Sequence, residues 1–220
     1  MRSALLDMLV CPTTGEPMEL FPEERAGDEI LGGYLCAGGQ RYPIINGVPC
    51  FLDSSQQMAS KAGFADMWRL RREGQFESRQ IYGIRPDRKA EWVESKFDGP
   101  FKPGTWVMDA GCGSADLTVS LAKRHPNTQF IALDFSETVR AVSADYREIK
   151  NLHFVQGDIA SPPIPPATLD RLFSIGVLHH TPHTHSAFLG AARLVAPDGG
   201  LLVWLYPDPT ESMVTLPLYV

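Results

Sequence analysis

Five short apolar runs follow one another in the C-terminal half of the chain, and segments with helical spacing separate them. The runs are Trp106–Met108, Phe130–Leu133, His153–Val155, Leu172–Ile175 and Leu201–Leu205. Between them, apolar side chains recur three or four positions apart, as at Leu117 and Leu121 or at Phe188, Ala192 and Val195. Strands that alternate with helices predict an α/β fold with a Rossmann-like, doubly wound parallel sheet. Ligands of such sheets bind at the carboxyl ends of the strands.

The N-terminal quarter of the chain has a different texture. Residues 1–53 are rich in Gly and Pro and hold short apolar runs at Tyr34–Cys36 and Tyr42–Ile45. Asn46-Gly47, directly after the second run, is a turn signal of the kind that joins hairpin strands. We therefore expect a small β-rich module in this part of the chain.

Residues 54–100 connect this module to the predicted α/β domain. They carry many charges together with spaced aromatic side chains, and Trp68 follows Phe64 by four positions. That spacing places both rings on one face of a helix. The sequence thus predicts three parts, which are the module at 1–53, a helical connector or cap at 54–100, and the Rossmann-like domain at 101–220.

Composition narrows the classes of protein to which the chain can belong. With 220 residues, 44% of them hydrophobic, it is long enough for one ordinary domain and a small one. The net charge of −6 argues against a nucleic-acid partner, although a local basic patch stays compatible with one. No apolar run approaches the roughly 20 residues of a membrane span, and the N-terminus lacks a signal-peptide core. Four cysteines without paired disulfide spacing favour the reducing cytoplasm.

The first apolar run leads into VMDAGCGSAD (107–116), where an acid precedes two closely spaced glycines. Such glycines let a strand turn tightly beside a ligand. A phosphate-binding P-loop would need a lysine followed by Ser or Thr, which this stretch lacks. A dinucleotide-binding loop would have Gly or Ala where Asp116 stands, and Asp109 would repel a pyrophosphate. An acid at this place suits a ligand with cationic groups instead.

Two further acids follow later strands of the predicted sheet. Asp134 comes 21 residues after Gly113 and can accept hydrogen bonds from both hydroxyls of a ribose, with Phe135 beside it to pack on a purine. Asp158 follows the third run and can accept from an adenine amino group, while the backbone N–H of Ile159 can donate to a ring nitrogen. The residues therefore indicate an adenosine with a cationic tail that carries no phosphate.

These segments resemble the ordered motifs of class I S-adenosylmethionine-dependent methyltransferases. The resemblance covers about residues 101–206 and rests on DAGCG (109–113), LD (133–134), GD (157–158), GVLHH (176–180) and PDGG (197–200). It implies that S-adenosylmethionine is the cofactor and that a methyl group passes in line to an acceptor.

The resemblance also implies which residues contact the cofactor. They are Asp109, Gly111, Gly113, Asp134, Phe135, Asp158 and Ile159. Asp109 is expected near the methionine amino group, and the two glycines against the methionine part. Asp134 is expected to hold the ribose, and the remaining three residues to surround the adenine.

Four of the six histidines gather in the segment HHTPHTH (179–185), after the fourth predicted strand. We expect no metal here, because Pro182 interrupts the segment and no carboxylate is interleaved. A solvated loop and a role near the methyl acceptor stay open. By resemblance to methyltransferases of small molecules, His180 or its neighbour His179 is the candidate catalytic residue, which orients the acceptor or takes its proton.

The module at 1–53 resembles the short zinc-ribbon-like proteins that activate RNA and protein methyltransferases. The resemblance rests on LVCP (9–12), YLC (34–36) and YPIINGVP (42–49). A zinc ribbon needs two Cys-x-x-Cys knuckles, but Thr14 and Gly39 stand where the second cysteines belong. We therefore expect a metal-free module, in which Cys11 and Cys36 are small buried apolar side chains and whose surface is open to a protein partner.

The methyl acceptor is not identified by these residues. The module hints at a macromolecule, whereas the acidic balance and the LHH segment (178–180) slightly favour a small molecule. The alternative function is a non-catalytic protein that binds S-adenosylmethionine and regulates or scaffolds another protein. A nicotinamide oxidoreductase is a more distant alternative.

The chain ends soon after the fifth predicted strand. Methyltransferases of the class usually add two more strands, and residues 207–220 are too few for both at strand lengths of about five to six residues. The sequence thus predicts a fragment of a longer protein, or a domain whose open sheet edge a partner covers.

Overall fold

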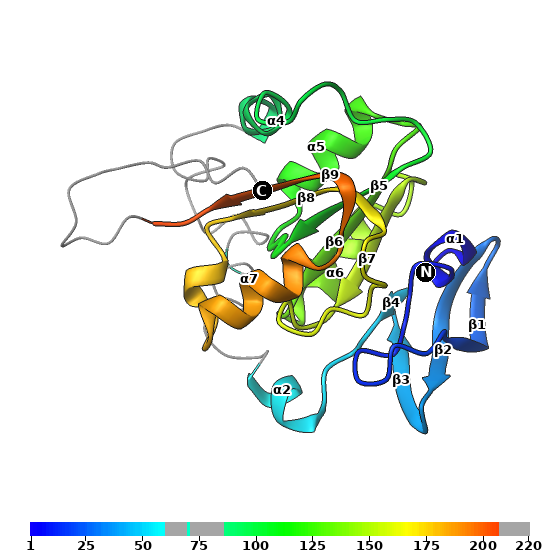
Figure 1. The fold of residues 1–220 in the computed structure, drawn as a ribbon. Coiled ribbons are helices and arrows are strands. Elements are labelled where there is room, and N and C mark those ends of the chain that lie inside the picture. Colours follow the sequence, from blue (N-terminus) through cyan, green and yellow to red (C-terminus); the bar gives the residue numbers. More distant parts are fainter. Residues whose placement is uncertain (60–69, 71–85, 207–220) are drawn as a thin grey trace.

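A five-stranded parallel sheet forms the centre of the computed structural model, which describes residues 1–59, 70 and 86–206 (Figure 1). Its strands lie in the order β7-β6-β5-β8-β9. Their bounds are Trp106–Ala110 for β5, Gln129–Asp134 for β6, Leu152–Gln156 for β7, Leu169–Ile175 for β8 and Val195–Trp204 for β9. The chain runs outward from β5 in both directions, so the point where strand order reverses lies beside β5. The predicted Rossmann-like α/β fold is confirmed.

Helices cover both faces of this sheet. The helices are α4 (Pro86–Glu94), α5 (Asp116–Arg124), α6 (Thr138–Asp145) and α7 (Thr184–Ala192). The first three pack with Val107 and Phe173 on one face, whereas α7 packs with Met108 and Leu172 on the other (Figure 1). Successive residues of one strand therefore enter opposite cores, which explains why the strands appear in the sequence as continuous apolar runs.

The last helix and strand differ from the sequence prediction at Val195. The spacing of Phe188, Ala192 and Val195 predicts one helix, but α7 ends at Ala192 and Val195 begins β9. The backbone N–H of Leu169 donates to the carbonyl of Leu194 at 2.9 Å, so the chain joins the sheet immediately after the helix. Pairing with β8 overrides the local helical spacing.

A separate antiparallel sheet forms the N-terminal module, as predicted. It contains β1 (Glu19–Ala26), β2 (Glu29–Ala37), β3 (Gln40–Ile45) and β4 (Val48–Pro49), preceded by the short helix α1 (Ser3–Leu6). Asn46 and Gly47 join β3 to β4 with positive φ angles of 53° and 81°. This is the geometry that makes Asn-Gly a hairpin signal.

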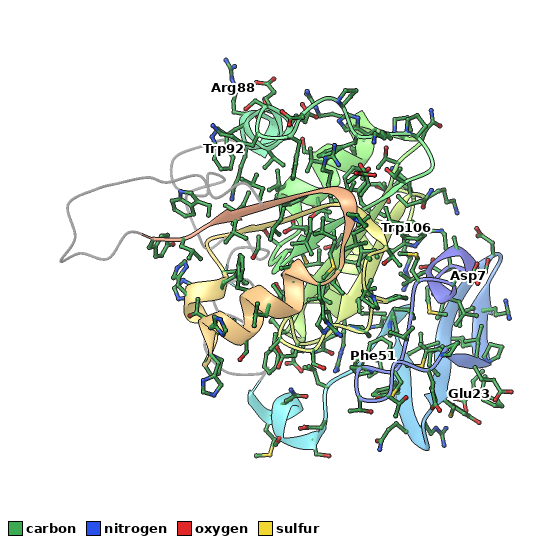
Figure 2. The ribbon with its side chains drawn as sticks, in the orientation of Figure 1. Asp7, Glu23, Phe51, Arg88, Trp92 and Trp106 are labelled. Carbon is green, nitrogen blue, oxygen red and sulfur yellow. The ribbon has the colours of Figure 1, made fainter. Side chains whose placement is uncertain are left out.

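The module attaches to the β7 edge of the large sheet. Phe51 donates its backbone N–H to the carbonyl of Gln156 at 2.8 Å, and Val10 donates to Pro163 at 3.0 Å. Figure 2 shows Phe51 where the chain passes from the module towards the large sheet, and its ring lies 4.9 Å from that of Tyr42. An unpaired strand edge invites association with other chains, and here the protein's own N-terminal part covers it.

Only one of the two knuckle cysteines is the buried side chain that the sequence predicts, because Cys36 is partly exposed. Cys11 is buried, and its sulfur lies 3.1 Å from the Thr13 hydroxyl and 3.4 Å from the Tyr42 hydroxyl. Within the described residues no three His, Cys, Asp or Glu side chains gather as a metal site. The absence of zinc stays a prediction. Phe64 and Trp68 of the expected connector lie outside the described residues.

None of the helices in the described part of the chain is long and apolar enough to cross a membrane.

Candidate functional site

The two glycines after β5 form a loop that bends over the end of β6. The backbone N–H groups of Gly111 and Cys112 both donate to the carbonyl of Leu133, at 2.8 and 3.0 Å. Gly111 has a φ of 94°, and a Cβ atom there would lie 2.4 Å from a methyl carbon of Val177. Gly113 also has a positive φ, of 54°. The position of Gly111 thus requires glycine for two reasons, its backbone conformation and the closeness of Val177.

Asp134 ends β6 and ties the glycine loop to it. One carboxylate oxygen accepts the backbone N–H of Gly113 at 2.7 Å, and the other accepts that of Ser136 at 2.8 Å. Burial raises the pKa of Asp134, and these backbone donors oppose the shift. Each carboxylate oxygen has a second lone pair, so the group keeps the capacity to accept hydrogen bonds from a ligand.

Asp109 lies within β5, two residues before the first glycine of the loop. It is 4% exposed, and the Thr118 hydroxyl of α5 donates to its carboxylate. Burial raises the pKa of Asp109 to about 7, although the Thr118 hydrogen bond and the positive charge of Lys89 oppose the shift. The carboxyl group is thus a partly protonated, buried acid at the centre of the sheet.

This pKa makes stability depend on pH. In the folded state Asp109 keeps its proton up to a higher pH than in the unfolded state, so its protonation stabilises the folded protein. This contribution to the free energy of unfolding is lost as pH rises from about 4 through about 7. We expect Asp109→Asn to be more stable than the wild type at pH 8 in the cofactor-free protein, with the difference shrinking towards pH 5. Urea unfolding at pH 5 and pH 8 measures the difference in the free energy of unfolding, and Asp198→Asn, at an exposed position, is the control. A difference independent of pH would contradict the shift.

The third acid, Asp158, follows β7 and has two hydrogen bonds of its own. One oxygen accepts the backbone N–H of Ala160 at 2.8 Å, and the other accepts the side-chain amide of Gln56 at 3.2 Å. Gln56 belongs to the helix α2 (Ser54–Ala59), 102 residues away in sequence. Sequence reasoning missed Gln56, since no local pattern points to it.

Phe135 and Ile159 flank these acids. The carbonyl of Phe135 accepts the amide of the buried Gln156 at 3.0 Å, and the Gln156 oxygen accepts from Arg140 at 2.7 Å. Ile159 is buried beneath α7, where a Cβ atom at Gly190 would lie 2.4 Å from the Ile159 carbonyl oxygen. The structure therefore brings all seven expected cofactor residues to the carboxyl ends of β5, β6 and β7.

The two candidate catalytic histidines lie at the end of β8, in a short 3-10 helix (Leu178–His180). The rings of His179 and His180 are 4.0 Å apart, and Tyr206 lies 4.2 Å from His179 and 5.2 Å from Trp204. We call these four residues the aromatic cluster. Both ring nitrogens of His179 are buried without a hydrogen-bond partner in the part of the chain that the structure describes. Burial lowers the pKa of His179, and His180 adds to the shift.

The remaining histidines of the HHTPHTH segment do not join this group. His183 precedes α7 and His185 lies in its first turn, and both are exposed. Pro182 separates them from the 3-10 helix, as expected for a residue that interrupts regular structure. Residues 181–183 therefore form the turn between the 3-10 helix and α7.

A comparison with known protein families matches the region that holds these residues. Residues 107–199 match the methyltransferase domain family. Over these residues, which are less than half of the chain, the α/β part is similar to methyltransferase domains. The family model begins inside β5 and ends inside β9, so it includes all three acids and both histidines of the site.

Curated relatives and a solved structure agree with this match. A trans-aconitate 2-methyltransferase of Methylobacterium nodulans is 38% identical over 107 residues, which are 48% of this chain and 40% of that protein. The enzyme of the same name from Acidovorax is 34% identical over 108 residues, with the same coverages. A Methanococcus maripaludis structure assigned to the S-adenosyl-L-methionine-dependent methyltransferases has a TM-score of 0.52 at 23% identity, covering 65% of this chain and 62% of that one. That structural likeness shows the fold. The chain spans only 40% of the length of the two curated relatives.

Proposed function

We propose that this protein transfers a methyl group from S-adenosylmethionine to an acceptor, with a small molecule as the favoured acceptor class. The observation that carries the proposal is the row of Asp109, Asp134 and Asp158 at the ends of adjacent parallel strands, beside a glycine loop. The four free cysteines agree with a reducing compartment, and we place the activity in the cytoplasm.

The donor groups of the cofactor fit this row of acids. S-adenosylmethionine offers a cationic amino group, two ribose hydroxyls and an adenine amino group, and each acid supplies an acceptor for one of them. In this assignment Asp109 faces the amino acid part, Asp134 holds the ribose and Asp158 holds the adenine. No lysine or arginine is needed, since the cofactor carries no phosphate.

The bound cofactor supplies a methyl group that its sulfonium already activates. What the chain must supply is position, because an in-line displacement requires the acceptor atom roughly 3 Å away and opposite the sulfur. Water must also be kept out of this space. The glycine loop holds one side of the site, and the aromatic cluster at the ends of β8 and β9 stands at its other side.

The aromatic cluster supports the acceptor role of His180 and His179. It stands at the same end of the sheet as the acids, beside the central strand, and His179 has two ring nitrogens without a partner among the described residues. A ligand with a hydrogen-bonding group could satisfy them. The two curated relatives are named for trans-aconitate, a small molecule, which also favours a small acceptor for this protein.

Activity is tested with labelled S-adenosylmethionine and fractionated small-molecule and macromolecular extracts. A labelled product in the small-molecule fraction is the expected result, with boiled protein as the control. Cofactor binding without any labelled product in either fraction would favour the regulatory or scaffold function instead.

His180 is the residue whose loss should separate turnover from cofactor binding. If it orients or deprotonates the acceptor, His180→Ala lowers turnover by more than about tenfold and leaves cofactor affinity nearly unchanged. Steady-state kinetics and calorimetry measure the two quantities. His185→Ala, an exposed histidine of α7, is the matched control. Normal turnover of the acceptor by His180→Ala would contradict the role of His180 at the acceptor.

A further inference from the structure

A short helix outside the methyltransferase match reaches one of the cofactor acids. This helix, α2, begins with a capping box, in which the backbone N–H of Gln56 donates to the Asp53 carboxylate at 2.8 Å. The backbone N–H of Asp53 donates in return to the side-chain oxygen of Gln56 at 3.0 Å. The reciprocal bonds satisfy two helix N-terminal donors. They also occupy the oxygen of the Gln56 side-chain amide, so that its nitrogen faces away from Asp53.

The free end of that amide points at Asp158. With its oxygen occupied by Asp53, the Gln56 amide presents its nitrogen, which donates to one Asp158 oxygen at 3.2 Å. The other Asp158 oxygen is held by the backbone N–H of Ala160. A carboxylate held at both oxygens cannot turn freely about its side-chain bonds. Each oxygen keeps one lone pair in a defined direction.

The position of α2 is set by the attachment of the module to the large sheet. Phe51, two residues before the capping Asp53, donates its backbone N–H to Gln156 at the end of β7. Asp158 follows Gln156 by two residues. The same backbone contact that joins the module to β7 therefore brings Gln56 to Asp158.

We propose that Gln56 is a positioning residue for nucleobase recognition, which fixes the Asp158 carboxylate so that it accepts from the 6-amino group of adenine. This inference rests on the proposed function of Asp158. It assigns to the N-terminal part of the chain a role in the cofactor site. A nucleobase with a 6-oxo group would place an acceptor against the fixed carboxylate and would be rejected.

The test compares the binding of S-adenosylhomocysteine with that of S-inosylhomocysteine, its 6-oxo analogue, by calorimetry. The wild type should bind the adenine compound much more tightly. In Gln56→Ala, the Kd for S-adenosylhomocysteine should rise about three- to tenfold, which is the net value of one ordinary hydrogen bond, because Gln56 acts on the ligand only through Asp158. The Kd for S-inosylhomocysteine should stay unchanged, so the preference for adenine falls by the same factor.

A second variant separates this role from helix capping. Gln56→Glu keeps an oxygen for the Asp53 N–H but replaces the amide donor by a negative charge beside Asp158. It should therefore weaken S-adenosylhomocysteine binding more than Gln56→Ala does, while thermal unfolding stays close to that of the wild type. Met58→Ala is the control, because Met58 lies on the same helix and is 78% exposed.

The outcomes are distinct. A wild type that binds neither compound would overturn the cofactor assignment and the role of Gln56 with it. A wild type that binds S-adenosylhomocysteine, with equal affinity in Gln56→Ala and Gln56→Glu, would overturn the role of Gln56 alone. An equal loss of affinity for both compounds in Gln56→Ala would show that the residue supports the fold and does not position Asp158.

Discussion

Replacing Asp134 by alanine is expected to weaken S-adenosylmethionine binding by about 1.5–3 kcal/mol, which is roughly a 10- to 150-fold rise in Kd. Two losses contribute to this effect. The ribose hydroxyls lose a charged acceptor, and the glycine loop loses the carboxylate that accepts the Gly113 N–H at 2.7 Å. Cofactor binding should therefore suffer both directly and through a less ordered loop.

Calorimetry on the folded variant measures this change. Asp134→Asn keeps one acceptor oxygen and should lose less affinity than Asp134→Ala. The exposed Asp198 lies in β9 and serves as the matched Asp→Ala control. Unchanged affinity in a folded Asp134→Ala protein would contradict the assignment of Asp134 to the ribose.

Replacing Gly111 by alanine is expected to lower the free energy of unfolding by about 2–4 kcal/mol. The backbone at φ 94° is strained for any residue with a Cβ atom, and that atom would lie 2.4 Å from a Val177 methyl carbon. Either the loop or Val177 must move. The loop directly follows β5, and Val177 directly precedes the 3-10 helix with the candidate catalytic histidines. Urea unfolding with linear extrapolation measures the loss.

A double-mutant cycle divides this loss into its two causes. Val177→Ala removes both methyl groups that the new Cβ atom would meet. In that background Gly111→Ala should cost less, and the cost that remains reports the backbone strain together with the contact to the Cβ atom of residue 177, which would still lie 2.9 Å away. The same cost in both backgrounds would show that the closeness of Val177 contributes nothing.

Much of the α/β fold follows from the sequence because its local patterns have direct physical meaning. A strand buried on both faces carries mostly apolar side chains, so β5, β6, β7 and β8 appear as apolar runs at their observed places. The same runs predict the candidate cofactor acids. Parallel strands place their carboxyl ends at one edge, so acids that end successive runs must lie near each other.

The helix end at Ala192 shows where local pattern is insufficient. Val195 fits the helical spacing, yet Leu194 and Val195 pair with β8, because hydrogen bonds in the sheet are available only after the chain has folded. Local spacing reports the preference of a segment, and the neighbouring strand decides its end.

The sequence by itself determined the alternation of strands and helices, the Asn-Gly hairpin of the module and the glycine turn after β5, because each depends on residues close in the chain. Only the tertiary structure decided that the module covers β7, that Val177 fills the space beside Gly111 and that Gln56 reaches Asp158. These contacts join residues far apart in the chain, with 102 positions between Gln56 and Asp158 and more between Phe51 and Gln156. Their geometry is set by how the two sheets meet, which no spacing along the chain encodes.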